Sequence, residues 1–150
     1  MDCIFCKLIA GEIPSTRVYE DADTLAFLDI APIINGHTLV IPKTHVDPLT
    51  AASPAVLAAC MATVQRVAQA QMDALGADGV NIHQANGTAA GQVVPHLHFH
   101  VIPRFADDGH HWNWQGHAYK DITEMQALGR KLIAAIETPA AEEKDTCWKN

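Results

Sequence analysis

The sequence predicts an α+β domain, with an antiparallel sheet of about five strands, one long central helix and a C-terminal helix. Three observations lead to this fold class. Apolar side chains alternate with histidines at a period of two over residues 95–103, which is typical of a half-buried strand. Apolar residues also recur at three- and four-residue steps over 57–75 and over 125–136, which indicates two helices, each with one apolar face.

Length, composition and charge limit the class of protein. With 150 residues, 49% of them hydrophobic and 18% charged, the chain can bury one core, so we expect a single domain over 1–138 and a flexible tail over 139–150. The net charge of −7 and the lack of a Lys/Arg cluster argue against a nucleic-acid polymer as partner, but not against a single nucleotide. No apolar run reaches the roughly 18 residues that cross a membrane. No secretory signal is visible, so we expect a cytoplasmic protein.

The N-terminal half is predicted to hold a short helix and three strands. Residues 3–11 form a helix or turn that Gly11 ends, with Pro14 beyond it. β-branched and aromatic residues between polar turns and prolines then predict three short strands, over 17–20, 24–29 and 37–42.

The next segment is predicted to form the long helix. Ser53 supplies an N-cap, Pro54 suits the first helical position, and Gly76 ends the helix. The periodicity assigns its sheet-facing side to six residues: Leu57, Met61, Val64, Ala68, Met72 and Leu75.

A fourth strand over 79–84 and a polar turn lead back into the histidine strand over 95–103, which suggests an antiparallel pair. The C-terminal helix is predicted to begin at a capping box made by Thr123 and Gln126, and to end before Pro139.

Three histidines alternate within the predicted fifth strand. In a strand, His96, His98 and His100 share one face, while the apolar residues between them point into the core. They are either ordinary polar residues of an exposed sheet face or the centre of a working site. We favour the working site, because histidine is uncommon and three at strict alternation between core residues are hard to obtain by drift.

These motifs, in this order, resemble the histidine-triad (HIT) family of nucleotide-binding hydrolases and transferases, in particular its bacterial-type members with a Cys-x-x-Cys zinc site. The likeness spans about residues 3–105 through Cys3-Ile-Phe-Cys6, Ala26-Phe-Leu-Asp-Ile30, Gly36-His-Thr-Leu-Val-Ile-Pro-Lys43, Asn86-Gly87, Gly91-Gln92 and His96-x-His98-x-His100. It implies a HIT-like fold, a purine nucleotide as substrate, and a homodimer formed through the long helix and a sheet strand.

The resemblance implies that His98 is the nucleophile. An unperturbed imidazole titrates near pH 6.5, so it needs little activation, and its bond to phosphorus is labile to water. His100 would hydrogen-bond a phosphoryl or leaving-group oxygen, and His37 would orient the nucleophile or stabilise its charged form. Alternatively, His37 caps its strand and His100 is a surface residue.

Nucleotide-binding residues follow from the same resemblance. Asp29 would accept hydrogen bonds from the ribose hydroxyls; alternatively it only forms a turn. Five apolar residues would hold the base, although ordinary core packing explains them equally well: Ile4, Phe5, Leu8, Phe27 and Ile30.

The segment Gly91-Gln92-Val93 can offer backbone N–H groups to phosphate, and the side chains of Asn86 and Gln92 can add donors. The family usually carries Ser or Thr where this chain has Val93. We therefore expect slower turnover of substrates that need that hydroxyl.

A second site would bind zinc. Cys3, Cys6, His45 and His96 can supply a tetrahedral Cys₂His₂ set, and four protein ligands leave no open position, so the ion would be structural. Cys3 and Cys6 could instead be a redox pair, or the three alternating histidines could bind a catalytic zinc, though no carboxylate is then placed as a general base. We favour the structural zinc.

Other aromatic and histidine residues carry less information. Trp112 and Trp114 are candidates for the leaving-group side of the pocket. We interpret four further histidines as solvated or structural: His83, His110, His111 and His117.

The function we predict is a hydrolase or nucleotidyl transferase that cleaves the α-phosphorus of a purine nucleotide derivative, a phosphoramidate or a dinucleoside polyphosphate. It would pass through a covalent nucleotidyl-histidine and release a nucleoside monophosphate. The alternatives are a nucleotide-binding regulatory module with negligible turnover, and a redox or metal-carrier protein without nucleotide affinity.

Overall fold

The computed structural model describes residues 2–111 and 116–137. The chain forms two compact units, Met1–His110 and His111–Asn150, and each is described by itself. The first unit carries the sheet, the long helix and every residue of the candidate site.

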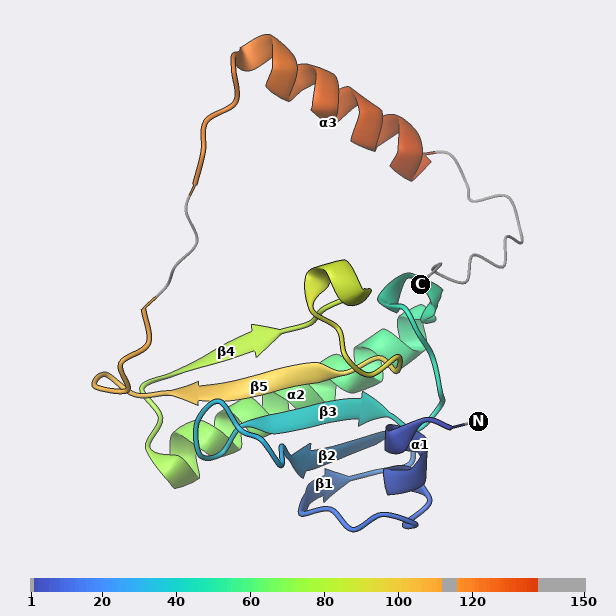
Figure 1. The fold of residues 1–150 in the computed structure, drawn as a ribbon, viewed down its shortest axis with the longest axis vertical. Coiled ribbons are helices and arrows are strands. Elements are labelled where there is room, and N and C mark those ends of the chain that lie inside the picture. The colour runs from blue at the N-terminus through green and yellow to red at the C-terminus, as the bar shows by residue number, and fades with distance from the viewer. Residues whose placement is uncertain (1, 112–115, 138–150) are drawn as a thin grey trace. The chain divides into compact units, whose positions relative to one another are not determined.

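A five-stranded sheet is the centre of the first unit, in the order β1-β2-β3-β5-β4 (Figure 1). Every neighbouring pair of strands is antiparallel, which confirms the predicted sheet. The strands are β1 (Arg17–Glu20), β2 (Thr24–Leu28), β3 (Thr38–Pro42), β4 (Gly79–His83) and β5 (Phe99–Arg104). Strands β1 and β4 are the edges of the sheet, and β5 lies between β3 and β4.

Helix α2 (Pro54–Leu75) covers one face of the sheet, and its bounds agree with the sequence. The Ser53 hydroxyl accepts a hydrogen bond from the Val56 N–H at 3.3 Å. Gly76 ends the helix with a left-handed φ of 68°, a conformation that glycine adopts without strain.

The buried face of α2 differs in part from the predicted one. Met61, Met72 and Leu75 are about half exposed, at 46%, 47% and 50%. The residues that face the sheet are Cys60, Thr63, Val64, Val67 and Gln71. Hydrophobic periodicity missed part of this face because two of its members are polar and satisfied by partners on the sheet side. The Thr63 hydroxyl bonds that of Thr24 at 2.8 Å, and Gln71 Nε2 donates to the carbonyls of Gly36 and Val101.

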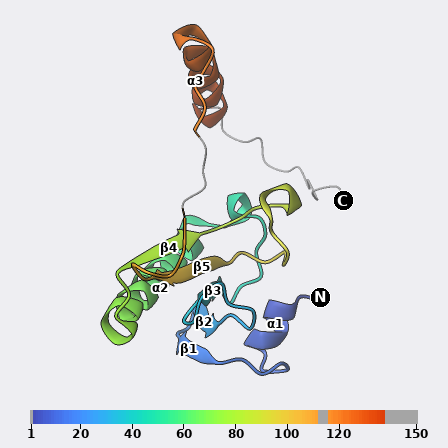
Figure 2. The same cartoon turned by 60° about the vertical axis from the view of Figure 1, so that its left-hand side comes forward.

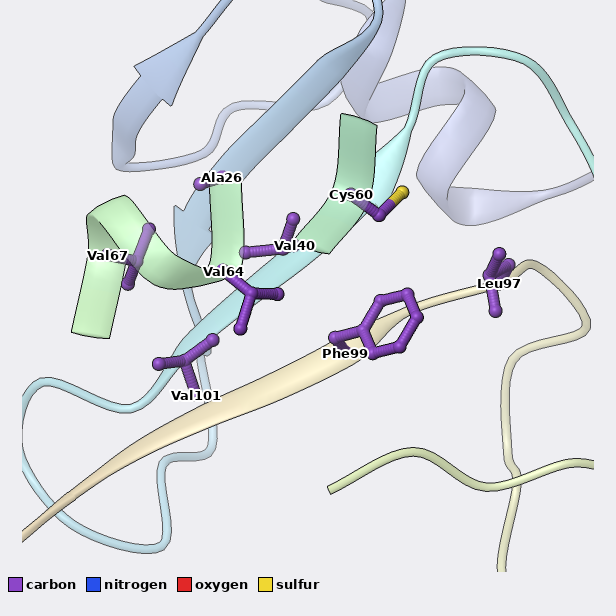
Figure 3. Close-up of a cluster of buried hydrophobic side chains, with 8 residues drawn as sticks. All are labelled: Ala26, Val40, Cys60, Val64, Val67, Leu97, Phe99 and Val101. Atoms are coloured by element: carbon purple, nitrogen blue, oxygen red, sulfur yellow. The ribbon is translucent and has the colours of Figure 1, made fainter. Parts of the chain in front are cut away.

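The main core lies between α2 and the strands (Figure 3). Leu97, Phe99 and Val101 point into it, as the alternation predicts. From the other elements it takes Ala26, Val40, Cys60, Val64 and Val67. Burying a large apolar side chain contributes about 1.5–3 kcal/mol, so this layer fixes which face of β5 carries the histidines.

Helix α1 (Ile4–Ile9) lies across β2 and β3 from α2 (Figure 2). Its Phe5 and Leu8 are buried in a second apolar cluster with four strand residues: Leu25, Phe27, Leu39 and Ile41. Leu39 is the register partner of His100, and side chains directly opposite each other in antiparallel strands share a face. Helix α1 therefore sits on the histidine side of the sheet.

Strand β5 begins later than predicted, so the three alternating histidines do not lie on one strand. Only His100 is in β5. The His96 N–H donates to the Val94 carbonyl, forming a local turn, and the Leu97 N–H donates to the carbonyl of Val46, outside the sheet. These bonds draw the backbone out of the ladder, while the apolar side chains between the histidines still reach the core.

The second unit contains helix α3 (Ile122–Glu137). Its cap is not the predicted pair, because the Asp121 carboxylate accepts from the Glu124 N–H and the Glu124 carboxylate from the Lys120 N–H. Among the helices of the described residues, none combines the length and the apolar character that a membrane span needs. The predicted tail over 139–150, and Trp112 and Trp114, lie outside the described residues.

Candidate active site

His100 lies at the centre of a group of imidazoles. Its ring centroid is 5.0 Å from that of His98, 5.1 Å from that of His37 and 5.7 Å from that of His83. His37 immediately precedes β3, and His83 is the last residue of β4. The fold thus brings His37, His98 and His100 together, as the sequence predicts, and adds a histidine from the edge strand.

The ring of His98 is fixed in one tautomer by the backbone. Its Nδ1 lies 2.6 Å from the carbonyl oxygen of His96. A carbonyl oxygen can only accept, so Nδ1 carries the hydrogen and the lone pair is on Nε2. The buried Phe5 ring meets the imidazole edge-on at 5.4 Å and limits its rotation. This arrangement suits Nε2 of His98 to act as a nucleophile.

The hydrogen bonds of His37 fix the tautomer of His100 as well. The Ile33 N–H donates to His37 Nδ1 at 3.2 Å, so His37 carries its hydrogen on Nε2. His37 Nε2 lies 2.9 Å from His100 Nδ1, which must then accept and leave the His100 hydrogen on Nε2. The structure therefore places His37 against His100 rather than against His98.

Burial keeps both of these rings neutral. It lowers the pKa of His37 below its ordinary value, and the nearby Asp29 carboxylate opposes that shift only in part. Burial, followed by the neighbouring His98, His37 and His83, lowers the pKa of His100 to about 4. Near neutral pH, His100 is thus an uncharged ring with an Nε2–H donor.

Asp29 lies at the end of β2, beside His37. One carboxylate oxygen accepts from the Ala31 N–H at 2.9 Å, as a turn aspartate does. The other lies 3.5 Å from His37 Nδ1. Asp29 therefore forms the turn that was the alternative to a binding role. Its second carboxylate oxygen nevertheless lies beside His37.

The five apolar residues predicted to hold a base fall into two sets. Phe5, Leu8 and Phe27 are buried in the α1 cluster. Ile4 and Ile30 are 49% and 101% exposed. The three buried residues belong to the core and can also line a binding site from behind. The two exposed residues offer apolar surface to solvent.

The side chains of Asn86 and Gln92 hold the loop that precedes the histidines. Gln92 Oε1 accepts from the Gly87 N–H at 2.7 Å, and its Nε2 donates to the Asp47 carboxylate at 2.7 Å. Asn86 Oδ1 accepts from the Leu49 N–H at 2.8 Å. Their amide groups are thus used to shape the loop.

The same loop also decides which of the three predicted backbone N–H groups is open to a ligand. The N–H groups of Gly91 and Gln92 donate to the carbonyls of Thr88 and Gly87. Within the described part of the chain, the Val93 N–H has no hydrogen-bond partner, and the Val93 side chain is 90% exposed. Of the three predicted backbone donors, that of Val93 is the one available to an anion.

A Cys/His group lies beside the nucleophile. Cys3, at the N-terminal cap of α1, Cys6, His45 and His96 offer ligand atoms that lie within 4.8 Å of one another. His96 Nδ1 is 3.5 Å from Cys3 Sγ and 3.2 Å from His45 Nδ1, and Cys6 Sγ is 3.4 Å from His45 Nδ1. Zinc with ordinary bond lengths places such atoms about 3.3–3.8 Å apart, so the set fits a tetrahedral ion.

The tautomer of His96 also fits a metal. Its Nε2 lies 2.9 Å from the Pro42 carbonyl oxygen, so Nε2 carries the hydrogen and the Nδ1 lone pair faces the thiols. Burial lowers the pKa of His96, which favours the neutral ring that binds metals. The ring is fully buried, and Phe5 lies edge-on to it as it does to His98.

Gly36 positions His37. Its φ is +95°, and a Cβ there would lie 2.6 Å from Leu75 Cδ1 and 3.2 Å from Pro103 Cγ. Its carbonyl accepts from Gln71 Nε2 at 3.0 Å. The end of α2 therefore holds the turn from which His37 enters the site.

A cavity of about 800 Å³ is lined by residues of α2, β1 and β2 and by Gly36 and Thr38, which flank His37 in the chain. Its lining includes Val18, Leu28 and Arg66 and contains neither histidine nor cysteine. We therefore identify the candidate active site by its histidine and cysteine side chains and not by the volume of this cavity.

His83 is exposed, in agreement with the prediction of a solvated residue, but its place beside His100 was not predicted. The sequence favours a solvated or structural role for it, yet it pairs with His100 in the register of β4 and β5. A signal for this proximity is present in the sequence, because the 79–84 strand is expected to pair with the histidine strand and His83 is near its end.

Comparisons with known proteins agree with this geometry. The family model described as "HIT domain" matches residues 10–107. The "Protein hit" of Bacillus subtilis is 46% identical over 139 residues, covering 89% of this chain and 96% of its own. The "Adenosine 5'-monophosphoramidase hnt1" of Schizosaccharomyces pombe is 38% identical, covering 91% and 100%. The "Adenylylsulfatase HINT3" of Arabidopsis thaliana is 46% identical, covering 69% of this chain and 52% of that protein.

Solved structures are similar over the same range. The crystal structure of a HIT family member from Bacillus subtilis superposes with a TM-score of 0.83 at 41% identity, covering 89% of this chain and 96% of that one. A Zn-bound histidine triad family protein from Mycobacterium smegmatis superposes with a TM-score of 0.70 at 40% identity, covering 90% and 98%.

Proposed function

The chain belongs to the histidine-triad (HIT) family, and from this premise we propose that it cleaves the α-phosphorus of a purine nucleotide derivative. The substrate would be a phosphoramidate or a dinucleoside polyphosphate, and the product a nucleoside monophosphate. The observation that carries the proposal is the His98 tautomer, with Nδ1–H held by the His96 carbonyl and the Nε2 lone pair unprotonated. The names of the relatives from S. pombe and A. thaliana support a hydrolase that acts on nucleotides.

The proposed reaction has two displacements at phosphorus. Nε2 of His98 attacks the α-phosphorus, and the bond to the leaving group breaks with its electron pair on the departing atom. A departing amine nitrogen also takes up a proton, so it leaves as a neutral amine. Water then attacks the same phosphorus and gives up a proton, and the P–N bond to His98 breaks with its electron pair returning to Nε2. One difficult displacement thus becomes two easier ones.

The neighbouring histidines are proposed to orient and stabilise these steps. His100 donates its Nε2–H to a phosphoryl or leaving-group oxygen, and the 2.9 Å contact with His37 keeps that hydrogen on Nε2. The unpartnered Val93 N–H, with Gly91 permitting close approach, receives a further phosphate oxygen. Asn86 and Gln92 act by holding this loop.

The nucleoside is proposed to lie between α1 and the end of β2. Asp29 accepts hydrogen bonds from the ribose hydroxyls through the oxygen that faces His37. The base packs against the apolar residues of α1 and β2, with Ile4 and Ile30 offering the exposed apolar surface. Phe5, Leu8 and Phe27 form the wall behind them.

We propose a structural zinc ion held by Cys3, Cys6, His45 and His96, whose ligand spacing supports it. When bound, the ion crosslinks α1 to the segment that precedes β5. The zinc bound by the related M. smegmatis protein is consistent with this proposal.

We also propose a homodimer formed through α2 and β4. Two observations support it: Met61 and Met72 expose apolar surface on α2, and the outer edge of β4 has backbone groups that no neighbouring strand pairs, and both features favour association. Light scattering should then give the mass of two chains in solution. The mass of one chain would contradict the dimer.

The test of the function compares the wild type with His98→Ala on adenosine 5′-phosphoramidate and on diadenosine tetraphosphate. We expect AMP release and an acid-labile nucleotide adduct on His98 in the wild type, and neither in His98→Ala. AMP binding by His98→Ala, measured by calorimetry, shows that the variant is folded. His117→Ala, an exposed histidine of the second unit, is the control and should retain the wild-type rate.

A regulatory module would give a different pattern. It would bind AMP in both proteins with neither turnover nor adduct. A redox or metal-carrier protein would bind no nucleotide at all. Either result would overturn the proposed function.

A further inference from the structure

His83 lies directly opposite His100, on edge strand β4, and in the dimer proposed above the β4 backbone makes the contact while the His83 side chain points to the histidine face of the sheet. The two residues are register partners in the antiparallel pair β4–β5, so their side chains lie on the same face. Their ring centroids are 5.7 Å apart. Unlike His37, His98 and His100, His83 is exposed to solvent. It therefore extends the histidine group toward the edge of β4.

The order of the strands shows on which side of His100 the His83 side chain lies. Strand β5 has β3 and then β2 on one flank and β4 on the other. Asp29 and Phe27, proposed to hold the nucleoside, belong to the β2 flank. A substrate with its nucleoside there and its α-phosphorus at His98 leaves the β4 flank for the departing group.

We propose that His83 binds the departing group and favours substrates whose leaving group is an anion, such as a phosphate chain, over those that release a neutral amine. This inference rests on the proposed function and adds to it the class of leaving group. None of the roles implied by the family resemblance involves His83.

The chemistry of the first displacement requires such a group. When the His98 Nε2–P bond forms and the P–O bond breaks, the departing oxygen keeps the electron pair and gains negative charge. A charge-assisted hydrogen bond from an imidazolium stabilises that charge. His100 cannot supply it near neutral pH, because burial disfavours its cation and lowers its pKa to about 4. An exposed ring on the same face keeps its hydration when it is charged.

In the described part of the first unit, His100 is the ionisable group that the ring contacts and the strand register place against His83. His100 faces it directly from β5, and His98, His37 and Asp29 surround His100 on its other sides. A hydrogen bond to the departing anion is stronger when the imidazole that donates it is protonated, so we expect a larger effect at pH 6 than at pH 8.

The experiment measures kcat/KM for diadenosine tetraphosphate, whose leaving group is an anion, and for adenosine 5′-phosphoramidate, whose leaving group is an amine. His83→Ala should lower the first value about tenfold at pH 6 and the second less than twofold. The loss should shrink at pH 8, and His83→Lys, which keeps its charge, should restore the rate at both pH values. Asn81→Ala changes the same face of β4 two residues away, and is the control for damage to the strand.

The outcomes separate the two proposals. Equal losses on both substrates, or no loss on either, would overturn the role of His83 and leave the hydrolase intact. A loss in Asn81→Ala as large as in His83→Ala would assign the effect to strand structure and overturn the inference. Absence of turnover by the wild type on both substrates would overturn the proposed function and the inference with it.

Discussion

His37 Nε2 lies 2.9 Å from His100 Nδ1, and the direction of this hydrogen bond is set by the backbone amide of Ile33, which precedes His37 in the same turn. The Ile33 N–H donates to the other nitrogen of His37, so His37 is the donor and His100 the acceptor. The hydrogen on His100 is thereby kept on Nε2, the nitrogen that is not occupied by His37.

His37→Phe tests this relay, because it keeps an aromatic ring and removes the hydrogen bond. We expect kcat to fall about 10- to 100-fold with little change in KM, since His100 is then free to adopt the wrong tautomer. His37→Gln, which retains an N–H donor, should recover part of the loss. A kcat equal to that of the wild type in His37→Phe, with an unchanged melting temperature, would contradict the relay.

Val93→Ser tests the departure of this chain from the usual family pattern. Val93 is 90% exposed, so the change should alter the free energy of unfolding by less than about 0.5 kcal/mol. We expect kcat on adenosine 5′-phosphoramidate to rise several-fold, because the hydroxyl can donate a hydrogen bond to the departing amine. Val93→Ala is the control without a hydroxyl. Unchanged rates on every substrate would show that the hydroxyl is not needed.

Cys3→Ala tests the metal centre. We expect about one zinc ion per chain in the wild type and almost none in the variant, measured by elemental analysis after gel filtration. AMP affinity should also weaken, because Phe5 and Leu8 lie on the helix that Cys3 caps. Cys60→Ala removes a thiol buried in the main core, outside the Cys/His group, and should keep its zinc. Full zinc occupancy in a normally folded Cys3→Ala protein would exclude Cys3 as a ligand.

The stability of the protein should fall as the solution is acidified from about pH 6.5 to pH 4. The pKa of His100 is about 4 in the folded chain against an ordinary value near 6.5, so in this interval the unfolded chain binds a proton that the folded chain does not. The folded state therefore loses on the order of 1–2 kcal/mol from this half-buried ring. Burial lowers the pKa of His37 in the same direction.

Urea unfolding at pH 7 and pH 4.5 measures this loss. His100→Asn, which cannot titrate in this range, should show a smaller difference between the two pH values than the wild type. Equal differences in the two proteins would contradict the assignment to His100.

Local sequence signals are sufficient to predict a feature of the fold when one residue and its near neighbours determine it. Ser53 and Gly76 place both ends of α2, because a side-chain cap and a left-handed glycine act within one turn. The strand pairing follows from alternation and turns. The predicted face of α2 is wrong in part: Leu57, Val64 and Ala68 do pack in the core. The prediction misses Thr63 and Gln71, because their burial depends on partners that are distant in the chain.

The chemistry of the site depends on contacts that no local pattern contains. The tautomer of His96 is fixed by the carbonyl of Pro42, and that of His100 by the ring of His37, both of which are distant in the chain. The start of β5 likewise depends on a bond from Leu97 to Val46. The role suggested for His83 requires the register of two strands, which only the folded chain supplies.

Gly36 touches no proposed substrate atom, yet its φ of +95° strains any other residue, and a Cβ there would press on the side chains of Leu75 and Pro103. A side chain there would push against Leu75 and shift the entry of His37, so the damage would be measured as lost turnover. A mutational screen that scores activity alone would accordingly rank position 36 among the catalytic residues. Thermal unfolding of the same variants would separate a structural role from a catalytic one, because a Gly36→Ala protein should have a lower melting temperature as well as a lower rate.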